Sequence, residues 1–143
     1  MAKTIYTAEA HVTGGRAHGH GVTNDGRLDV QLRPPTDDIE TGTNPEQLFA
    51  VGYAACFEGA LAAVSRRTKV ELGDVAIDSS VSLITTEDRG YTVAVKLDVT
   101  LPQISDSDQA REIVTAAHHV CPYSNATRGN IDVELVANGQ PVG

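Results

Sequence analysis

The chain has 143 residues, of which 41% are hydrophobic and 21% are charged. This length predicts one domain over residues 1–143, and the composition is that of a globular protein rather than a disordered one. Lys and Arg number 11 against 19 Asp and Glu, a net charge of -8 that argues against nucleic acid or an anionic membrane as partner. No uninterrupted apolar run reaches the ~18 residues of a membrane span. Residues 1–6 lack the apolar core of a signal peptide, so we expect a cytoplasmic protein.

The first third of the chain predicts short strands. Residues 4–12 are rich in Ile, Tyr, Thr and Val, which favour extended structure. Residues 24–26 (Asn-Asp-Gly) are typical of a hairpin turn, and residues 28–32 alternate apolar and polar side chains as a half-buried strand does. Two prolines at 34–35 end this strand, and the polar residues 36–43 predict a loop.

A long helix is predicted from residue 45 to about residue 68. Residues 44–46 (Asn-Pro-Glu) supply an N-cap, a proline at the first helical position and an acid in the first turn. Between residues 48 and 64 the only charge is Glu58, so the helix is apolar almost all round. Such a helix is expected to be buried on most sides, which suggests that a partner subunit covers part of it.

The second half of the chain predicts two paired strands, a second helix and a last strand. Residues 75–83 and 91–101 alternate apolar and polar side chains across a short turn, and residues 131–135 do so again. Residues 106–121 have helical spacing that places Cys121 on the core-facing side at the helix end. The expected fold class is α+β, with antiparallel strands around two main helices.

Cys56 and Cys121 are the only cysteines. In a reducing compartment a structural disulfide is not expected, and the simplest interpretation is that each is a small buried hydrophobe. A reactive Cys56 in this apolar helix would need a fixed cation, best an Arg, because burial raises the pKa of a thiol. A buried Arg in turn needs a carboxylate to hold it. Room for another group to approach the Cys56 sulfur is left by its mostly small helical neighbours, Gly52, Tyr53, Gly59 and Ala60.

Three segments closely resemble the organic hydroperoxide resistance (Ohr) proteins of the wider OsmC/Ohr family. They are residues 44–49 (Asn-Pro-Glu-Gln-Leu-Phe), residues 52–57 (Gly-Tyr-Ala-Ala-Cys-Phe) and residues 121–130 (Cys-Pro-Tyr-Ser-Asn-Ala-Thr-Arg-Gly-Asn). The resemblance spans nearly the whole chain from Tyr6, and the third segment favours Ohr over its OsmC sister group. It implies an intertwined homodimer of α+β subunits that acts as a thiol peroxidase.

The resemblance also implies residue roles. Cys56 matches the peroxidatic cysteine, Cys121 the resolving cysteine, Arg16 the catalytic arginine and Glu46 the glutamate that pairs with it. The implied reaction reduces an organic hydroperoxide through a Cys56 sulfenic acid and a Cys56–Cys121 disulfide. Dihydrolipoamide or a lipoylated protein is the implied reductant, with no bound cofactor and no metal. Glu58 stands where an apolar residue is usual, so the dielectric near Cys56 is expected to differ.

Several of these residues also have simpler interpretations. The pair His18 and His20, and the pair at 118–119, match no standard zinc spacing, and a solvated hairpin and a helix face would explain them. Glu46 could serve only as a helix-start residue, Arg16 as a solvated turn residue, and Arg128 as a cap for the segment after Cys121. The alternative function is a non-catalytic dimeric carrier that binds lipid-like molecules in an apolar pocket, with both cysteines inert.

The spacing of Glu46 and Cys56 bears on how the site is assembled. Ten residues of straight helix separate them by ~15 Å along the axis and about 80° around it. An Arg16 that contacted both in the same chain would be badly stretched. Either the helix breaks near Gly52, or Arg16 and Glu46 reach Cys56 from the partner subunit. We expect the second arrangement, an active site composed across a homodimer interface.

Overall fold

The computed structural model describes residues 2–36 and 41–143. They divide into two compact units, Met1–Leu48 and Phe49–Gly143. The loop predicted over residues 36–43 lies partly outside the described residues. One domain over residues 1–143 stays a prediction.

The first unit is built on a three-stranded antiparallel sheet in the order β1-β2-β3, with strands β1 (Ala10–Thr13), β2 (Gly19–Thr23) and β3 (Asp29–Leu32). The predicted hairpin turn joins β2 to β3. The prediction of a strand from residue 4 is wrong, since β1 begins only at Ala10. Ala10 pairs with Thr23, where β2 ends, so within this sheet the residues before Ala10 have no strand to pair with.

The helical turn α1 (Gly15–His18) follows β1, where the sequence predicted only a hairpin. Glycines allow this turn to be so tight. Gly14 has φ 79°, in the left-handed region, and a Cβ there would lie 2.6 Å from the carbonyl oxygen of His18. A Cβ at Gly19 would lie 2.1 Å from the carbonyl oxygen of Gly15. Both positions therefore require glycine, and they bracket Arg16.

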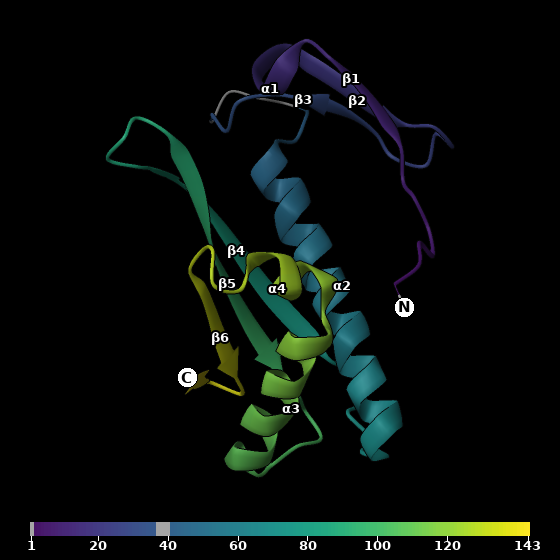
Figure 1. Ribbon diagram of the computed structural model, residues 1–143, viewed down its shortest axis with the longest axis vertical. Coiled ribbons are helices and arrows are strands. Elements are labelled where there is room, and N and C mark those ends of the chain that lie inside the picture. Colours follow the sequence, from purple (N-terminus) through teal and green to yellow (C-terminus); the bar gives the residue numbers. More distant parts are fainter. Residues whose placement is uncertain (1, 37–40) are drawn as a thin grey trace. The chain divides into compact units, whose positions relative to one another are not determined.

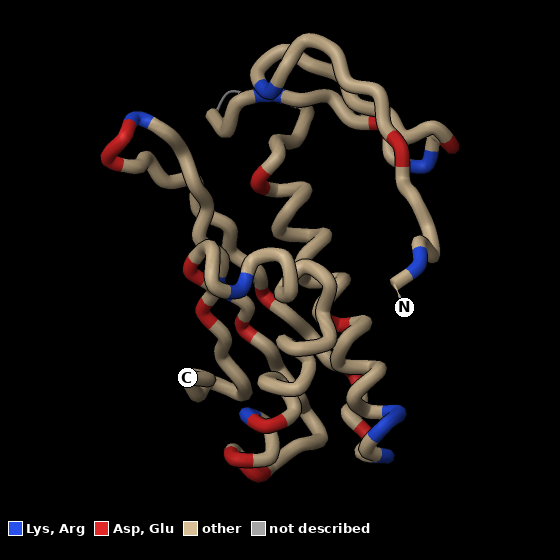
Figure 2. The backbone as a smooth tube through the Cα atoms, in the orientation of Figure 1, with Lys and Arg blue, Asp and Glu red and all other residues tan. Residues whose placement is uncertain are grey.

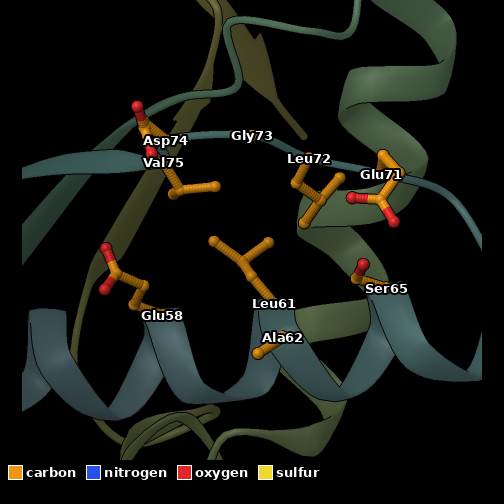
Figure 3. A pocket seen from close by; sticks show the side chains of 9 residues that line it. All are labelled: Glu58, Leu61, Ala62, Ser65, Glu71, Leu72, Gly73, Asp74 and Val75. Carbon is orange, nitrogen blue, oxygen red and sulfur yellow. The ribbon is translucent and has the colours of Figure 1, made fainter.

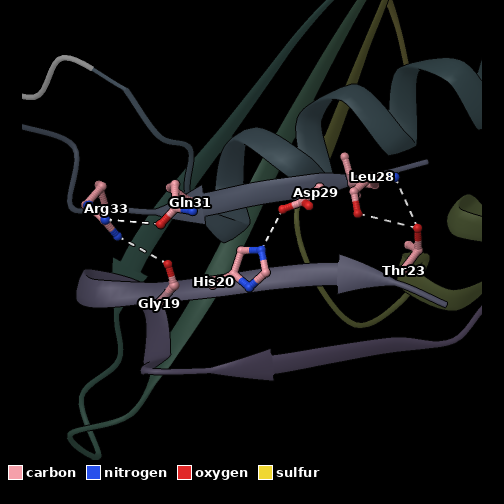
Figure 4. A network of polar contacts seen from close by, with 7 residues as sticks. All are labelled: Gly19, His20, Thr23, Leu28, Asp29, Gln31 and Arg33. Carbon is pink, nitrogen blue, oxygen red and sulfur yellow. Dashed lines mark hydrogen bonds and ion pairs between the residues drawn. The ribbon is translucent and has the colours of Figure 1, made fainter. Parts of the chain in front are cut away.

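Side chains reinforce the pairing of β2 with β3 (Figure 4). His20 Nε2 is hydrogen-bonded to Asp29 Oδ1 across the two strands at 2.5 Å. The Arg33 guanidinium donates to the Gly19 carbonyl oxygen and to Gln31 Oε1, each at 3.2 Å. These contacts hold the short sheet beneath the turn that carries Arg16.

Helix α2 (Pro45–Thr68) confirms the long predicted helix. Asn44 is its N-cap, because Asn44 Oδ1 accepts the backbone N–H of Gln47 at 2.9 Å. The helix runs through Gly52 without interruption, so the alternative of a break there is wrong. Within this single chain the helix is not buried on most sides, since Val51 is 72% exposed, and the cover expected from a partner subunit stays a prediction. One face alone enters the core, through Tyr53, Phe57, Ala60, Leu61 and Val64.

The second unit contains a four-stranded sheet in the order β4-β5-β6-β7, with strands β4 (Ala76–Thr85), β5 (Tyr91–Thr100), β6 (Val133–Ala137) and β7 (Gln140–Val142). The predicted antiparallel pairing holds for β4 with β5. It fails for β5 and β6, which are parallel, because the chain crosses over through helices between them. The short strand β7 was not predicted.

Helix α3 (Ser107–Val120) confirms the second predicted helix, and Asp106 caps its N-terminus. Its buried stripe packs with α2 and with residues of β5 in one core, so both helices cover the sheet (Figure 1). Pro122 ends the pattern as predicted, but it also opens a further short helix, α4 (Pro122–Thr127), that the sequence did not predict. Proline is well suited to a first helical position because its missing N–H has no partner there.

The charge distribution bears on the expected absence of a nucleic-acid partner, and helix α2 bears on the expected absence of a membrane partner. Lys and Arg positions are scattered along the described chain and form no continuous basic track (Figure 2). By length and composition alone α2 could cross a membrane. One face of α2 packs in the core of the second unit.

Candidate functional site

The two cysteines, 65 positions apart in the chain, lie in contact in the second unit. Cys56 projects from α2, and Cys121 lies at the junction of α3 and α4. The Cys121 thiol donates to Cys56 Sγ at a sulfur–sulfur distance of 3.5 Å, and both thiols are free. A disulfide bond has a length of about 2.05 Å, so a small rotation of the side chains would bring the sulfurs within bonding distance.

The start of α4 directs its backbone donors at both sulfurs. Cys121 is the N-cap, and its Sγ accepts the backbone N–H of Ser124 at 3.5 Å. The backbone N–H of Tyr123 points to the Cys56 sulfur. Pro122, between Cys121 and Tyr123, has no N–H to offer. The first two N–H groups of α4 thus both face thiol sulfurs.

The surroundings of Cys56 within the second unit disfavour its thiolate form. Burial raises the pKa of Cys56 above its ordinary value, and the neighbouring Cys121 raises it further. The N–H of Tyr123 lowers this pKa without cancelling the effect of burial. A reactive thiolate at Cys56 therefore needs a positive charge beyond what the second unit supplies, in agreement with the requirement drawn from the sequence.

Three aromatic rings, those of Phe49, Tyr53 and Tyr123, pack together between α2 and α4. Tyr123 stacks on Phe49 with ring centroids 5.7 Å apart and meets Tyr53 edge-on at 5.8 Å. A Cβ added at Gly52 would lie 3.5 Å from the Tyr123 ring. The room that this small neighbour of Cys56 leaves is therefore occupied by Tyr123.

Sequence reasoning missed three side chains that join α2 to α4. The Tyr53 hydroxyl is hydrogen-bonded to Ser124 Oγ at 2.8 Å and to Thr127 Oγ1 at 3.0 Å, and all three side chains are buried. Two hydroxyl residues three positions apart just after Pro122 were the available signal, because that spacing places both on one face of a helix. This spacing indicates a shared face only in a helix, and the sequence predicted that the helix before Pro122 ends there rather than that a new helix begins.

Arg16 and Glu46 form an ion pair in the first unit, between Arg16 Nη2 and Glu46 Oε1. Arg16 lies in α1 and Glu46 in the first turn of α2, and their side chains are 49% and 18% exposed. The carboxylate that was expected to hold the arginine is thus in place. The structure brings Arg16 to Glu46 and Cys56 to Cys121. A single site that contains all four residues stays a prediction, because the two pairs lie in different units.

His20 and His118 have different local surroundings. His20 is bonded to Asp29, as described above. Burial lowers the pKa of His118 at the end of α3, and the positive charges of Arg128 and His119 act in the same direction. Arg128 donates to the His118 carbonyl oxygen at 2.9 Å and to Asn125 Oδ1 at 2.7 Å, which confirms its capping role. Within residues 2–36 and 41–143, no three His, Cys, Asp or Glu side chains gather as a metal site requires.

A separate cavity of about 410 Å³ lies between the second half of α2 and residues 71–75 (Figure 3). Three carboxylates, those of Glu58, Glu71 and Asp74, surround an apolar floor that includes Leu61. Cys56 is not among the lining residues. Glu58 lines this cavity, and its expected effect on the dielectric near Cys56 stays a prediction.

Comparisons with known proteins agree on one family. Residues 35–136 match the family model for OsmC-like proteins. The chain is 50% identical over 137 residues to an organic hydroperoxide resistance protein of Xanthomonas axonopodis pv. citri, covering 93% of this chain and 94% of that one. It is 48% identical to the organic hydroperoxide resistance protein OhrB of Bacillus subtilis, covering 92% of this chain and 96% of that protein. The OhrB crystal structure superposes with a TM-score of 0.86 over 93% of this chain and 98% of the other.

Proposed function

Because the chain belongs to the organic hydroperoxide resistance proteins of the OsmC-like family, we propose that it detoxifies organic hydroperoxides by reducing them to alcohols. The observation that carries this proposal is the contact between Cys56 and Cys121. Two free thiols in contact at a helix junction are the arrangement that a thiol peroxidase needs.

Cys56 is the nucleophile in the proposed reaction. Its thiolate attacks the outer oxygen of the hydroperoxide, an S–O bond forms and the O–O bond breaks. Cys56 becomes a sulfenic acid, and the leaving alkoxide takes a proton to become the alcohol. Cys56 fits this role better than Cys121, because it is only partly buried whereas Cys121 is fully buried.

Cys121 resolves the sulfenic acid. Its thiol attacks the Cys56 sulfur, the S–O bond breaks, and water leaves as the disulfide forms. The contact between the two sulfurs supports this step, because it limits the time for which the sulfenic acid is open to further oxidation. A dithiol of the lipoyl class, dihydrolipoamide or a lipoylated protein, then reduces the disulfide by exchange and is itself oxidised.

Arg16 supplies the positive charge that Cys56 lacks, and Glu46 orients the guanidinium. An arginine keeps its charge when it is buried and can bridge two anionic groups, here the carboxylate and the thiolate or leaving oxygen. We place Arg16 and Glu46 of one subunit beside Cys56 of its partner in a homodimer, in the cytoplasm. The unbroken α2 supports this arrangement, since Glu46 and Cys56 lie ten residues apart on one continuous helix.

The proposal is tested by titration of free thiols after one equivalent of cumene hydroperoxide is added to the reduced protein. We expect both thiols to be lost and an intramolecular disulfide to appear in the mass spectrum. Hydrogen peroxide in a parallel sample should react more slowly, because an apolar tail gains about 25 cal/mol per Å² of buried apolar area that hydrogen peroxide cannot gain. Faster reaction with hydrogen peroxide would contradict the assignment of organic substrates.

The alternative function, a non-catalytic carrier of lipid-like molecules, predicts the opposite outcome. Both thiols would remain free after hydroperoxide is added, and the protein would bind an alkyl chain without consuming peroxide. The contact between the sulfurs favours the enzyme, because a carrier has no need to bring its two cysteines together.

A further inference from the structure

We propose that Tyr53 is a positioning residue for the disulfide step, and that its buried hydroxyl holds α4, and with it Cys121, in place against the helix that carries Cys56. This inference rests on the proposed function for its catalytic meaning. The geometry that carries it lies entirely within the second unit.

The hydroxyl contact and the sulfur contact are parallel links between the same elements. Tyr53 precedes Cys56 by three residues on α2. Ser124 lies within α4 and follows Cys121, the N-cap of that helix, by three residues. Residues three apart on a helix lie on the same face, one turn from each other. The link from Tyr53 to Ser124, 2.8 Å long, thus lies one helical turn from the link between the two sulfurs.

The short helix α4 needs such an anchor. It has six residues, and helices of this length are not stable by themselves, so contacts with the rest of the unit must hold it. Tyr53 makes two of these contacts with one oxygen, to Ser124 Oγ and, at 3.0 Å, to Thr127 Oγ1. Those two residues span most of α4, so the hydroxyl fixes the orientation of the helix as well as its distance from α2.

The start of α4 also carries the donors that meet the sulfurs. The backbone N–H of Ser124 meets Cys121 Sγ at 3.5 Å, and that of Tyr123 points to Cys56. Displacement of α4 from α2 would therefore weaken the contact of the Tyr123 N–H with Cys56 and separate the two sulfurs, while the contact of Ser124 with Cys121 would move with α4. The ring packing of Tyr53 does not depend on its hydroxyl, so Tyr53→Phe removes the anchor and keeps the aromatic contacts.

The first experiment measures how the Cys56 sulfenic acid divides between disulfide and over-oxidised products. Reduced protein is treated with increasing cumene hydroperoxide, and intact mass gives the fractions of disulfide, sulfinic and sulfonic acid. In Tyr53→Phe, the hydroperoxide concentration at which half of the protein is over-oxidised should be about five- to tenfold lower than in the wild type, because the substitution removes both buried hydrogen bonds of the hydroxyl. The rate of the first oxidation of Cys56 should fall by a smaller factor than this shift, whereas a general loss of folding would abolish both steps together.

Companion variants separate positioning from stability. Ser124→Ala removes one of the two hydrogen bonds of the Tyr53 hydroxyl and should cause a smaller shift in the same direction, and the double variant should be no worse than Tyr53→Phe. Thr127→Ser keeps a hydroxyl and should resemble the wild type. Ser65→Ala is the matched control, because it removes a 2.7 Å hydrogen bond from Ser65 Oγ to the Val70 carbonyl oxygen at the far end of the same helix. An equal shift in Ser65→Ala, or none in Tyr53→Phe, overturns the proposal.

A second measurement does not depend on peroxidase activity. The equilibrium between the dithiol and the Cys56–Cys121 disulfide is measured in buffers of reduced and oxidised dithiothreitol. Tyr53→Phe should lower the equilibrium constant for disulfide formation about five- to tenfold, because the anchor raises the effective concentration of one thiol near the other. If the wild type does not react with hydroperoxide but this shift is present, the proposed function fails and the positioning role stands. An unchanged equilibrium constant overturns the positioning role.

Discussion

Cys56 and Cys121 are held by the core of the second unit, whereas Arg16 and Glu46 are held by a glycine-bounded turn and one ion pair in the first. Cys121 is fully buried, and Cys56 is partly buried and packs against the same core cluster. The Arg16 side chain is half-exposed, and its turn depends on Gly14 and Gly19 rather than on apolar packing. The difference indicates that the position of the two sulfurs depends on the packing that stabilises the second unit. Arg16, in contrast, can be replaced with little effect on the free energy of unfolding.

The largest expected effect comes from the cysteines. Cys56→Ser should abolish hydroperoxide consumption, because a serine hydroxyl at this position is not an adequate nucleophile and no second cysteine is exposed. Cys121→Ser should consume about one equivalent and then accumulate sulfinic or sulfonic acid at Cys56, since no resolving thiol remains. Both are measured by peroxide consumption with a lipoyl reductant and by mass spectrometry. Sustained turnover in Cys56→Ser would remove Cys56 from the mechanism.

The next largest effect concerns Arg16, and it tests whether the activity can be lowered without a change in the stability of the fold. Arg16→Ala should lower kcat/KM by about 10²–10³, as the loss of a fixed group that stabilises developing charge does. The free energy of unfolding should change by less than about 0.5 kcal/mol, as for most exposed positions. Urea denaturation and steady-state kinetics on the same sample give both values. If the free energy of unfolding fell by as much as the activation free energy rose, the contrast between the two units would be wrong.

Mixing Arg16→Ala with Cys56→Ser determines which subunit supplies the cation. If Arg16 acts on the partner's thiol, each heterodimer has one complete site, and random exchange should restore about one quarter of the wild-type rate per subunit. Exchange itself is followed with a mass-tagged copy of one variant. No recovery after complete exchange would place Arg16, Glu46 and Cys56 in one chain.

The smallest expected effect is a shift in the pH midpoint of alkylation of the Cys56 thiol. Burial raises the pKa of this thiol, so less thiolate is present at neutral pH than in a free cysteine, and alkylation by iodoacetamide should slow as the pH falls. In Arg16→Ala we expect the midpoint of alkylation at Cys56 to lie above that of an ordinary cysteine. In the wild type it should lie lower, because a nearby guanidinium favours the thiolate. Identical midpoints, read from the Cys56 peptide, would mean that Arg16 does not reach this sulfur.

Much of the fold could be predicted because its signals are local. The N-cap and proline at residues 44–45 defined the start of α2, and the apolar alternation defined β4 and β5. The short helix α4 could not be predicted, because six residues carry no helical period and a proline after a helix reads equally as an end or a beginning. The parallel pairing of β5 with β6 is likewise a property of the crossover rather than of either strand.

In the candidate site, too, some features could be predicted from the sequence and others could not. The residue types that the chemistry needs were evident from the chain, and the ion pair of Arg16 with Glu46 and the contact of Cys56 with Cys121 follow the predicted partners. What supports the sulfur contact was not evident. The hydroxyl link from Tyr53 joins residues 71 and 74 positions apart, and no periodicity within one element reports such a contact.

The 65-residue separation of the two sulfurs has a thermodynamic consequence for the whole catalytic cycle. A disulfide between them would close a loop that restricts the unfolded chain, and chain-entropy arguments give such a loop a stabilisation of about 4 kcal/mol. The oxidised protein, which cannot attack peroxide, would then be the form most resistant to unfolding. Each reduction would return the chain to its active but more easily unfolded form, so exposure to peroxide would itself protect the protein from unfolding until a dithiol restores it.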